Sequence, residues 1–464
     1  MNLGILSDPE LYPTSYEDVA IRMAVDEVNA ANMGIKINLV AADPFVPETP
    51  APIDPDADPN AEPTQETPVA EETETPATDA PTETPTTDAP IETPTDEPTA
   101  PVLPESAITS LLTKGVHAIL SPKSLGITED MVKELIAAKV PLISTATANP
   151  ESYNWVTQGL YINATPTSRL LGQALAEKLM IDGKGFIGLL RKNNFYSTLI
   201  KEGLDSELVP TTGQVIVDVP YAADTVFFNG AVDLALAKKP PTLVLLSDTE
   251  TTSLLNILLD AGYPAEQLVF VGANAHDYAP ADLTHPLTGA MAISSDFTVS
   301  EAFQTSLNDY LATLSDLVPA PSDGTEAELP VLDIDMASMS AAARAYDSVK
   351  LLALATLAGN SLEAKVLGDQ LRAVSGGDGV SKDAIVMTDF KLGAEALFEG
   401  KKIDFDGISG GFSYERSGEP RQAIFTIYHY DEHNVLVEGE QFIVPNEAFI
   451  ALLPKPLNDD GSAG

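Results

Sequence analysis

The segment "ESAITSLLTKGVHAILSP" (residues 105–122) decides the fold class, because it predicts a helix followed directly by a buried strand. Apolar residues have helical spacing over residues 105–114, and a largely apolar run then fills residues 116–121. A second helix over 127–139 and a second strand over 140–144 follow at once. This alternation predicts parallel strands joined by crossover helices.

The same alternation extends along most of the chain. Upstream, strands over 3–7 and 35–41 flank a helix over 16–31. Downstream, a second series predicts strands over 185–191, 213–219, 241–247, 267–272 and 288–295, with helices over 167–180, 196–208, 224–237 and 251–261. Further helices are predicted over 301–314 and 339–359, followed by a β-hairpin within 410–430 around a Ser-Gly-Glu-Pro turn. We therefore predict an α/β protein with two doubly wound, Rossmann-like lobes.

Composition narrows the classes of function. The 464 residues are 44% hydrophobic, enough for two lobes, and no apolar run approaches the roughly 18 residues of a membrane-spanning helix. A formal charge of −44 argues against partners that are nucleic acids or anionic membranes. Without cysteine, neither a disulfide nor a thiolate metal site can form. The start "MNLGILS" resembles a core strand behind an added Met, so we expect that a signal or lipoprotein leader has been removed.

An acidic insertion interrupts the first predicted lobe at about 44–104. It repeats Pro, Thr, Glu, Asp and Ala, and residues 37–113 contain 17 acidic side chains and no Lys or Arg. Frequent proline and scarce aromatic residues predict a disordered, extended loop of polyproline type. A tolerated surface insertion is the simpler interpretation; the alternatives are a spacer or a Thr-rich stalk that carries sugar.

Polar loops follow the predicted strands. In parallel sheets, ligands bind beyond the carboxyl ends of the strands. These loops are rich in hydroxyl, amide and aromatic side chains: residues 7–18, 121–126, 144–150, 191–197, 247–253 and 272–278. Any one of them could serve only as a turn or helix cap. Together they favour a site for a small polar ligand, with "STATANP" (144–150) lining its first-lobe half.

Several longer segments resemble the type I periplasmic binding proteins, in particular the branched-chain amino-acid (Leu/Ile/Val) branch that serves ABC importers. The resemblance excludes the insertion and the last 40 or so residues. It rests on the order and spacing of "TSYEDVAIRMAVDEVNA" (14–30), "ITSLLTKGVHAILSPKSLG" (108–126), "VPLISTATANPE" (140–151), "YINATPTSRLLGQALAEKL" (161–179), "ARAYDSVKLLALA" (343–355) and "FDGISGGFSYERSGEPRQ" (405–422).

The resemblance implies two lobes joined by three hinge crossovers that close over a ligand. Lobe 1 would comprise residues 1–163 and 294–415, and lobe 2 residues 164–293 and 416–464. It further implies an extracellular or cell-surface monomer, without a cofactor, that delivers a small molecule such as an amino acid to an ABC permease in the membrane. A surface sensor or adhesion module with the same fold but no transporter is the alternative.

In the first lobe, the resemblance implies ligand contacts from Ser124, through its hydroxyl and a helix N-terminal amide, and from the backbone of Ala146. A helix N-terminus there would favour a carboxylate. Where the family has threonine, this chain has Ala148, and the neighbouring Thr147 is the possible substitute. Tyr16 matches the aromatic residue that walls the ligand.

In the second lobe, Tyr196 matches a family tyrosine that faces the hinge. Asp248 stands where the amino-acid binders often have tyrosine, and Asn274 stands where they have the glutamate that pairs with the ligand ammonium. An unpaired buried ammonium would cost several kcal/mol. Either Asp248 supplies the missing charge, or the ligand is neutral or carries only a carboxylate.

Enzyme activity is not expected. The five histidines, at 117, 276, 285, 429 and 433, lack metal-ligand spacing, and neither a P-loop nor a G-x-S-x-G nucleophile motif is present. Asp277 beside His276 could form half of a triad, but a turn is the simpler interpretation. A hydrolase on an α/β scaffold is therefore the least favoured interpretation.

Overall fold

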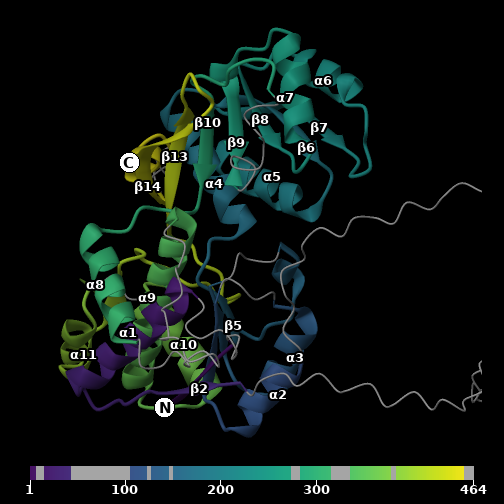
Figure 1. The fold of residues 1–464 in the computed structure, drawn as a ribbon. Helices are drawn as coiled ribbons and strands as arrows, with labels where there is room; N and C mark the ends of the chain where they lie inside the picture. Colours follow the sequence, from purple (N-terminus) through teal and green to yellow (C-terminus); the bar gives the residue numbers. More distant parts are fainter. Residues whose placement is uncertain are drawn as a thin grey trace, which may run out of the picture. The chain divides into compact units, whose positions relative to one another are not determined.

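The structure, a computed structural model, describes residues 1–6, 15–42, 105–122, 127–145, 150–272, 283–314, 335–377 and 383–453. Contacts divide the chain into a unit of residues 1–44 and 100–464 and a second unit of residues 45–99. The predicted insertion over 44–104 lies outside the described residues. All elements below belong to the first unit (Figure 1).

The first sheet is parallel throughout its described part. Its strands are β1 (Asn2–Ile5), β2 (Asn38–Ala41), β3 (Ala118–Ser121), β4 (Leu142–Ser144) and β5 (Tyr161–Asn163). They lie in the order β2-β1-β3-β4-β5. The second strand in the chain therefore lies outside the first, and the winding reverses between β1 and β3. A crevice that opens at such a reversal is the usual ligand site of open α/β sheets.

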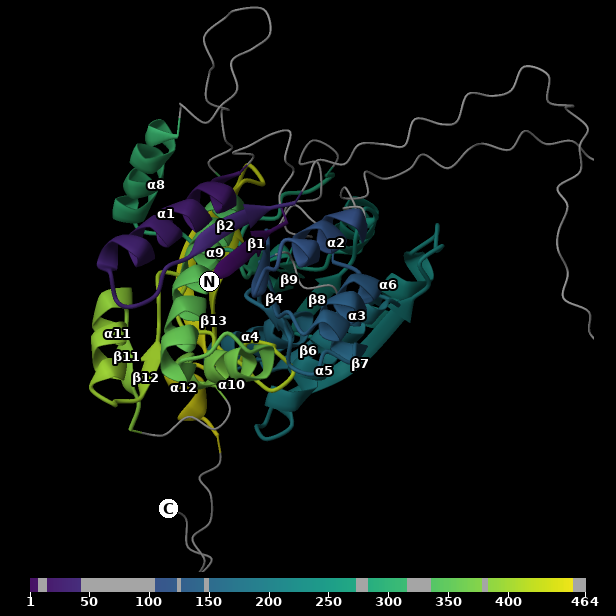
Figure 2. The same cartoon turned by 90° about the horizontal axis from the view of Figure 1, so that it is seen from below.

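Helices cover both faces of the first sheet. The apolar cluster on one face joins β1 to α1 (Tyr16–Ala31), α8 (Glu301–Thr313), α9 (Met336–Gly359), α10 (Ala364–Val374) and α11 (Phe390–Phe398). The cluster on the other face joins the strands to α2 (Glu105–Thr113) and α3 (Glu129–Ala138). Helices α1 and α9, over 300 residues apart in the chain, lie side by side (Figures 1 and 2). Most of α9 is buried, as expected of an alanine-rich helix that is apolar on nearly every side.

The second sheet repeats this winding. It contains β6 (Phe186–Lys192), β7 (Gln214–Tyr221), β8 (Thr242–Leu246), β9 (Leu268–Val271), β10 (Met291–Ser294), β13 (Ala423–Tyr430) and β14 (Leu436–Val444). Strands β7-β6-β8-β9-β10 are parallel, and β13 and β14 extend the sheet as an antiparallel hairpin. The reversal of winding here lies between β6 and β8.

Two further helical layers enclose the second sheet. One apolar cluster includes α6 (Asn229–Leu236) and α7 (Thr251–Asp260). The other includes α4 (Ser168–Ile181) and α5 (Phe195–Leu208), which pack closely because Gly172 and Gly203 have no side chain. The remaining short elements are η1 (Pro150–Asn154), η2 (Ala265–Gln267), α12 (Glu447–Ile450) and a small parallel sheet of β11 (Ile385–Met387) and β12 (Ile403–Phe405).

The chain passes between the two sheets three times: after β5, after β10, and between β12 and β13. Two doubly wound lobes joined by three crossovers, as predicted from the sequence, are therefore present. The residue boundaries of the lobes stay a prediction. No helix in the described part of the chain has the length and hydrophobicity of a membrane-spanning segment.

One predicted element is wrong. The Ser-Gly-Glu-Pro segment does form a hydrogen-bonded turn, with Gly418 N donating to Glu415 O at 3.0 Å, but residues 406–415 before it form no strand that could pair with β13 after it. The hairpin lies further along, where β13 pairs with β14. Alternation before the turn instead reflects burial, because the rings of Phe412 and Tyr414 stack 5.2 Å apart in the first-sheet core.

Helix α6 also begins later than predicted, at Asn229 rather than Asp224. Phe228, just before it, is buried and packs edge-on against Tyr221, with ring centroids 5.4 Å apart. This core contact holds the residue before the helix. A periodic pattern of apolar residues cannot show where such an anchor interrupts a helix.

Candidate functional site

The reversal of winding in the second sheet brings two opposite charges together. Lys192 is the last residue of β6, and Asp248 follows β8 by two residues. Because β6 and β8 are neighbours, their carboxyl ends lie side by side, and Lys192 Nζ lies 3.2 Å from Asp248 Oδ2. The Asp248 side chain is 54% exposed, so this carboxylate remains open to solvent while it holds the lysine.

A second carboxylate completes the cluster. Glu250 Oε2 lies 3.6 Å from Lys192 Nζ, and Glu250 Oε1 accepts a 2.6 Å hydrogen bond from the hydroxyl of Tyr221 at the end of β7. We call Lys192, Tyr221, Asp248 and Glu250 the charged edge cluster. With one ammonium and two carboxylates it has a net charge of −1, which attracts a cationic group.

Burial and charge shift the pKa values of two members. Partial burial lowers the pKa of the Lys192 ammonium, but hydrogen bonds and charge from Asp248 and Glu250 outweigh it, so the pKa rises above its usual value. Burial, with the hydrogen bond to Glu250, raises the pKa of the Tyr221 phenol. Lys192 is therefore charged and Tyr221 is a neutral donor at physiological pH.

Tyr196, in the first turn of α5, lies near this edge. Asn194 caps the helix by accepting a hydrogen bond from Ser197 N at 2.8 Å. The Tyr196 hydroxyl approaches Gly272, at the end of β9, so closely that a Cβ there would lie 2.6 Å from it. Burial first, and the charge of Asp248 second, raise the pKa of Tyr196. The structure thus brings two sequence-predicted residues, Tyr196 and Asp248, to the same edge.

Tyr16 has a different environment. It begins α1, is 4% exposed and belongs to the apolar core of the first sheet. Its hydroxyl donates a 2.8 Å hydrogen bond to Asn308 Oδ1 on α8. The phenol is therefore engaged within the protein, and its role in walling a ligand stays a prediction. Five predicted site residues lie outside the described residues: Ser124, Ala146, Thr147, Ala148 and Asn274.

Hydroxyl residues at the carboxyl edge of the first sheet are buried. Thr145, which follows β4, is 1% exposed, and its hydroxyl donates to Glu17 Oε1 at 2.7 Å. Its carbonyl oxygen accepts a 2.8 Å hydrogen bond from the Thr165 hydroxyl. The Thr145 hydroxyl is therefore engaged within the protein, where it joins the end of β4 to the first turn of α1, and the expectation that "STATANP" lines a ligand site stays a prediction.

Three members of the cluster, Lys192, Tyr221 and Glu250, are not among the site residues predicted from the sequence. Lys192 and Glu250 stand in two of the polar loops, 191–197 and 247–253, and Tyr221 lies two residues beyond the strand predicted over 213–219. A usable signal was present, namely charged or phenolic residues directly after apolar strands. What was missing was the order of the strands, which decides which of these ends meet.

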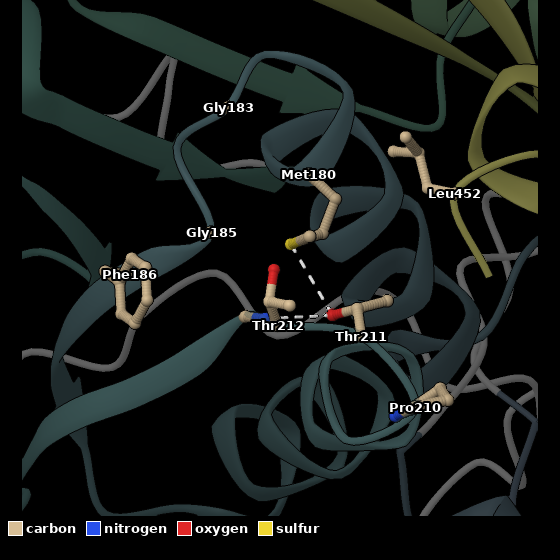
Figure 3. Close-up of a pocket in the computed structure, with 9 residues that line it drawn as sticks. Met180, Gly183, Gly185, Phe186, Pro210, Thr211, Thr212 and Leu452 are labelled. Atoms are coloured by element: carbon tan, nitrogen blue, oxygen red, sulfur yellow. Dashed lines mark hydrogen bonds between the residues drawn. The ribbon is translucent and has the colours of Figure 1, made fainter. Parts of the chain in front are cut away.

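A cavity of about 580 Å³ lies at the amino ends of β6 and β7, at the other end of these strands from the charged edge cluster (Figure 3). Thr211 and Thr212 are its polar side chains, and Met180, Phe186 and Leu452 are its large apolar ones. The Thr211 hydroxyl is engaged, since it accepts a 3.0 Å hydrogen bond from Gly213 N. No titratable side chain lines this cavity, so it offers nothing to pair with a charged ligand.

Within the described ranges, no group of three or more His, Asp or Glu is placed to hold a metal ion.

No protein-family model matches the chain, and no curated protein matches it in sequence. Solved structures match its fold. A branched-chain amino-acid ABC transporter periplasmic ligand-binding protein from Burkholderia xenovorans LB400 has a TM-score of 0.54 at 12% identity, covering 97% of this chain and 96% of that one. A protein from Rhodospirillum rubrum assigned as a branched-chain amino-acid ABC transporter has a TM-score of 0.53 at 13% identity, covering 95% and 99%. A protein from Silicibacter pomeroyi with the same assignment has a TM-score of 0.54 at 12% identity, covering 95% of this chain and 96% of that one.

At identities this low, the likeness shows the fold. The chain has the two-lobed α/β fold of type I periplasmic binding proteins, as its sequence predicts.

Proposed function

We propose that this protein is an extracellular solute-binding protein that captures a small ligand with an ammonium group and delivers it to an ABC importer. The charged edge cluster carries the proposal: a half-exposed carboxylate, Asp248, stands at the point where the strand winding reverses, with a net charge of −1 around it. Structurally similar proteins named for branched-chain amino-acid transport support the same class of ligand.

The proposed mechanism is capture without chemistry. Lobe 1 (1–163 and 294–415) and lobe 2 (164–293 and 416–464) would each supply one half of the site, and the ligand would stabilise the closed form by contacting both. Asp248 would take over the charge that the family glutamate provides, because Asn274 has no negative charge to neutralise an ammonium ion. Ser124, the Ala146 backbone and Thr147 would hold the other end of the ligand. A membrane permease would recognise the closed monomer.

A thermal-shift screen of ligand-stripped protein tests this proposal. Amino acids, their keto-acid and amide analogues and small peptides are the probes. We expect a higher melting temperature with ammonium-bearing compounds, since a ligand at 100 times its Kd adds about 2.7 kcal/mol of stability. The shift should disappear in Asp248→Asn and persist in Asp233→Asn, which removes an exposed carboxylate from α6.

Two outcomes contradict parts of the proposal. A response to keto acids or neutral solutes alone would refute the role of Asp248 and indicate a different cargo. No response to any probe would refute capture of this class of ligand.

A further inference from the structure

The charged edge cluster contains a cation, and this feature bears on which ligands it accepts. Lys192 lies between two carboxylates, 3.2 Å from Asp248 Oδ2 and 3.6 Å from Glu250 Oε2. A site that only needed to attract an ammonium ion would do so more strongly without this lysine. The presence of Lys192 therefore calls for a reason other than affinity for positive charge.

The two carboxylates are not equivalent. Glu250 is 15% exposed and is held on both oxygens, by Lys192 on one and by the Tyr221 hydroxyl on the other. Asp248 is 54% exposed and meets Lys192 through Oδ2. An incoming cationic group therefore meets Asp248, while Glu250 serves to hold Lys192 in place.

The backbone holds Lys192 in this position. Its carbonyl oxygen accepts a 2.9 Å hydrogen bond from Asn194 N and a 2.5 Å bond from the Ser197 hydroxyl. The next amide, Asn193 N, donates to Tyr221 O at 2.7 Å and joins the ends of β6 and β7. These bonds fix the backbone of Lys192, and the ion pairs with Asp248 and Glu250 place its ammonium, so a ligand meets one open negative charge and not two.

We propose that Lys192 is a specificity-determining residue: by neutralising one of the two carboxylates, it makes this edge accept a ligand end with one positive charge and disfavour an end with two. The inference rests on the proposed function and adds the charge count of the ligand. Removing Lys192 would leave a net charge of −2, which favours the doubly charged ligand. Arginine keeps the charge, so Lys192→Arg should keep the selectivity.

Two amino acids of nearly equal shape test the proposal on the full chain. L-Norvaline ends its side chain in a methyl group, and L-2,4-diaminobutyrate has an ammonium in its place. By titration calorimetry at pH 7, we expect the native chain to bind norvaline at least tenfold more tightly. Lys192→Gln should move this ratio about tenfold towards diaminobutyrate. Lys192→Arg and Lys201→Gln, which removes a cation paired with Asp205 on α5, should leave it unchanged.

An unchanged ratio in Lys192→Gln, with both probes still bound, would overturn the inference and leave the proposed function intact. NMR of the lysine ammonium groups in the ligand-free chain separates the remaining failures. A Lys192 pKa that does not fall in Asp248→Asn would show that the ion pair is absent in solution, which overturns the inference without any ligand. If the pair is intact and neither probe binds the native chain, the proposed function fails, and the specificity role of Lys192 fails with it.

Discussion

The hydroxyl of Thr145 donates a 2.7 Å hydrogen bond to Oε1 of Glu17, joining the end of β4 to the first turn of α1. Both residues are buried, at 1% and 4% exposure. Removing a hydrogen-bond donor from a buried carboxylate destabilises the folded protein more than removing one from an exposed carboxylate, because water cannot replace the buried bond. This contact therefore stabilises the edge of the first sheet.

Thr145→Val, which keeps the shape of the side chain, should lower the free energy of unfolding by about 1–3 kcal/mol. Chemical denaturation measures the loss, and the change of unfolding free energy with denaturant concentration should be the same in both proteins. Thr113→Val is the matched control, because Thr113 is exposed and its hydroxyl donates to the Ser110 carbonyl oxygen of its own helix. Equal stability of Thr145→Val and the native chain would show that the bond contributes nothing.

The turn before β13 packs against β5 through a glycine. Gly418 has φ +89°, its carbonyl oxygen accepts a 2.9 Å hydrogen bond from Asn163 N, and a Cβ there would lie 1.9 Å from Tyr161 O. Gly400 has a similar φ of +74°, but nothing lies within 4 Å of its Cβ position. A substitution at Gly400 therefore tests the backbone conformation alone, and one at Gly418 tests the backbone conformation together with the close packing.

Gly400→Ala should cost about 1 kcal/mol, from the positive φ alone. Gly418→Ala should cost at least about 2 kcal/mol more, because the turn must also move away from β5. Thermal and urea unfolding of both variants provide the comparison. Similar losses of unfolding free energy in the two variants would mean that the turn can move away from β5 without cost.

Buried carboxyls should make the protein more stable in mild acid. Burial, and secondarily the charge of Glu207, raises the pKa of Glu177 from 4.5 to about 7, although the amide of Asn446 donates to it. Native Glu177 thus binds its proton more tightly than the unfolded chain does. The resulting stability is fully present below about pH 4.5 and is lost as the pH rises to about 7.

Glu177→Gln should weaken the dependence of the free energy of unfolding on pH. It should also raise that free energy at pH 7 by about 1–2 kcal/mol, after allowance for partial solvent screening. The Gln carbonyl oxygen can still accept the Asn446 N–H. Glu202→Gln removes one exposed charge from α5 and should leave the slope unchanged. Denaturation at several pH values measures both, and parallel curves for the two variants would contradict the assignment.

Deletion of residues 45–99 should leave the rest of the chain folded. Contacts divide this segment from the unit formed by residues 1–44 and 100–464. With a short Gly-Ser linker in its place, we expect the melting temperature to change by less than about 2 °C, because shortening a long connection changes little but loop entropy. Calorimetry provides the measurement. A large loss of stability would show that the segment supports the fold.

Local signals were sufficient for most helices and strands. Helix α1 has the bounds that were predicted, because Ser15 caps it through Asp18 N and the apolar spacing continues to its end. Prediction failed where distant contacts decide the outcome. Phe412 and Tyr414 alternate like strand residues but fill the first-sheet core, and Phe228 delays the start of α6 by packing on Tyr221.

The site divides in the same way. Sequence pattern and family resemblance were enough to bring forward Asp248 and Tyr196, since both stand in polar loops directly after apolar strands. They could not reveal that Lys192 and Glu250 neutralise and hold one another beside Asp248, or that the hydroxyl of Thr145 is taken up by Glu17.

The amino-acid pattern was enough for the α/β class, the two rounds of winding and the polar loops that follow the strands, because apolar periodicity, helix caps and strand ends are local properties of the chain. Which charges meet at the carboxyl ends of the strands depends on the three-dimensional order of the strands. Strands β6 and β8 are neighbours in the sheet although β7 lies between them in the chain, and this order sets Lys192 3.2 Å from Asp248.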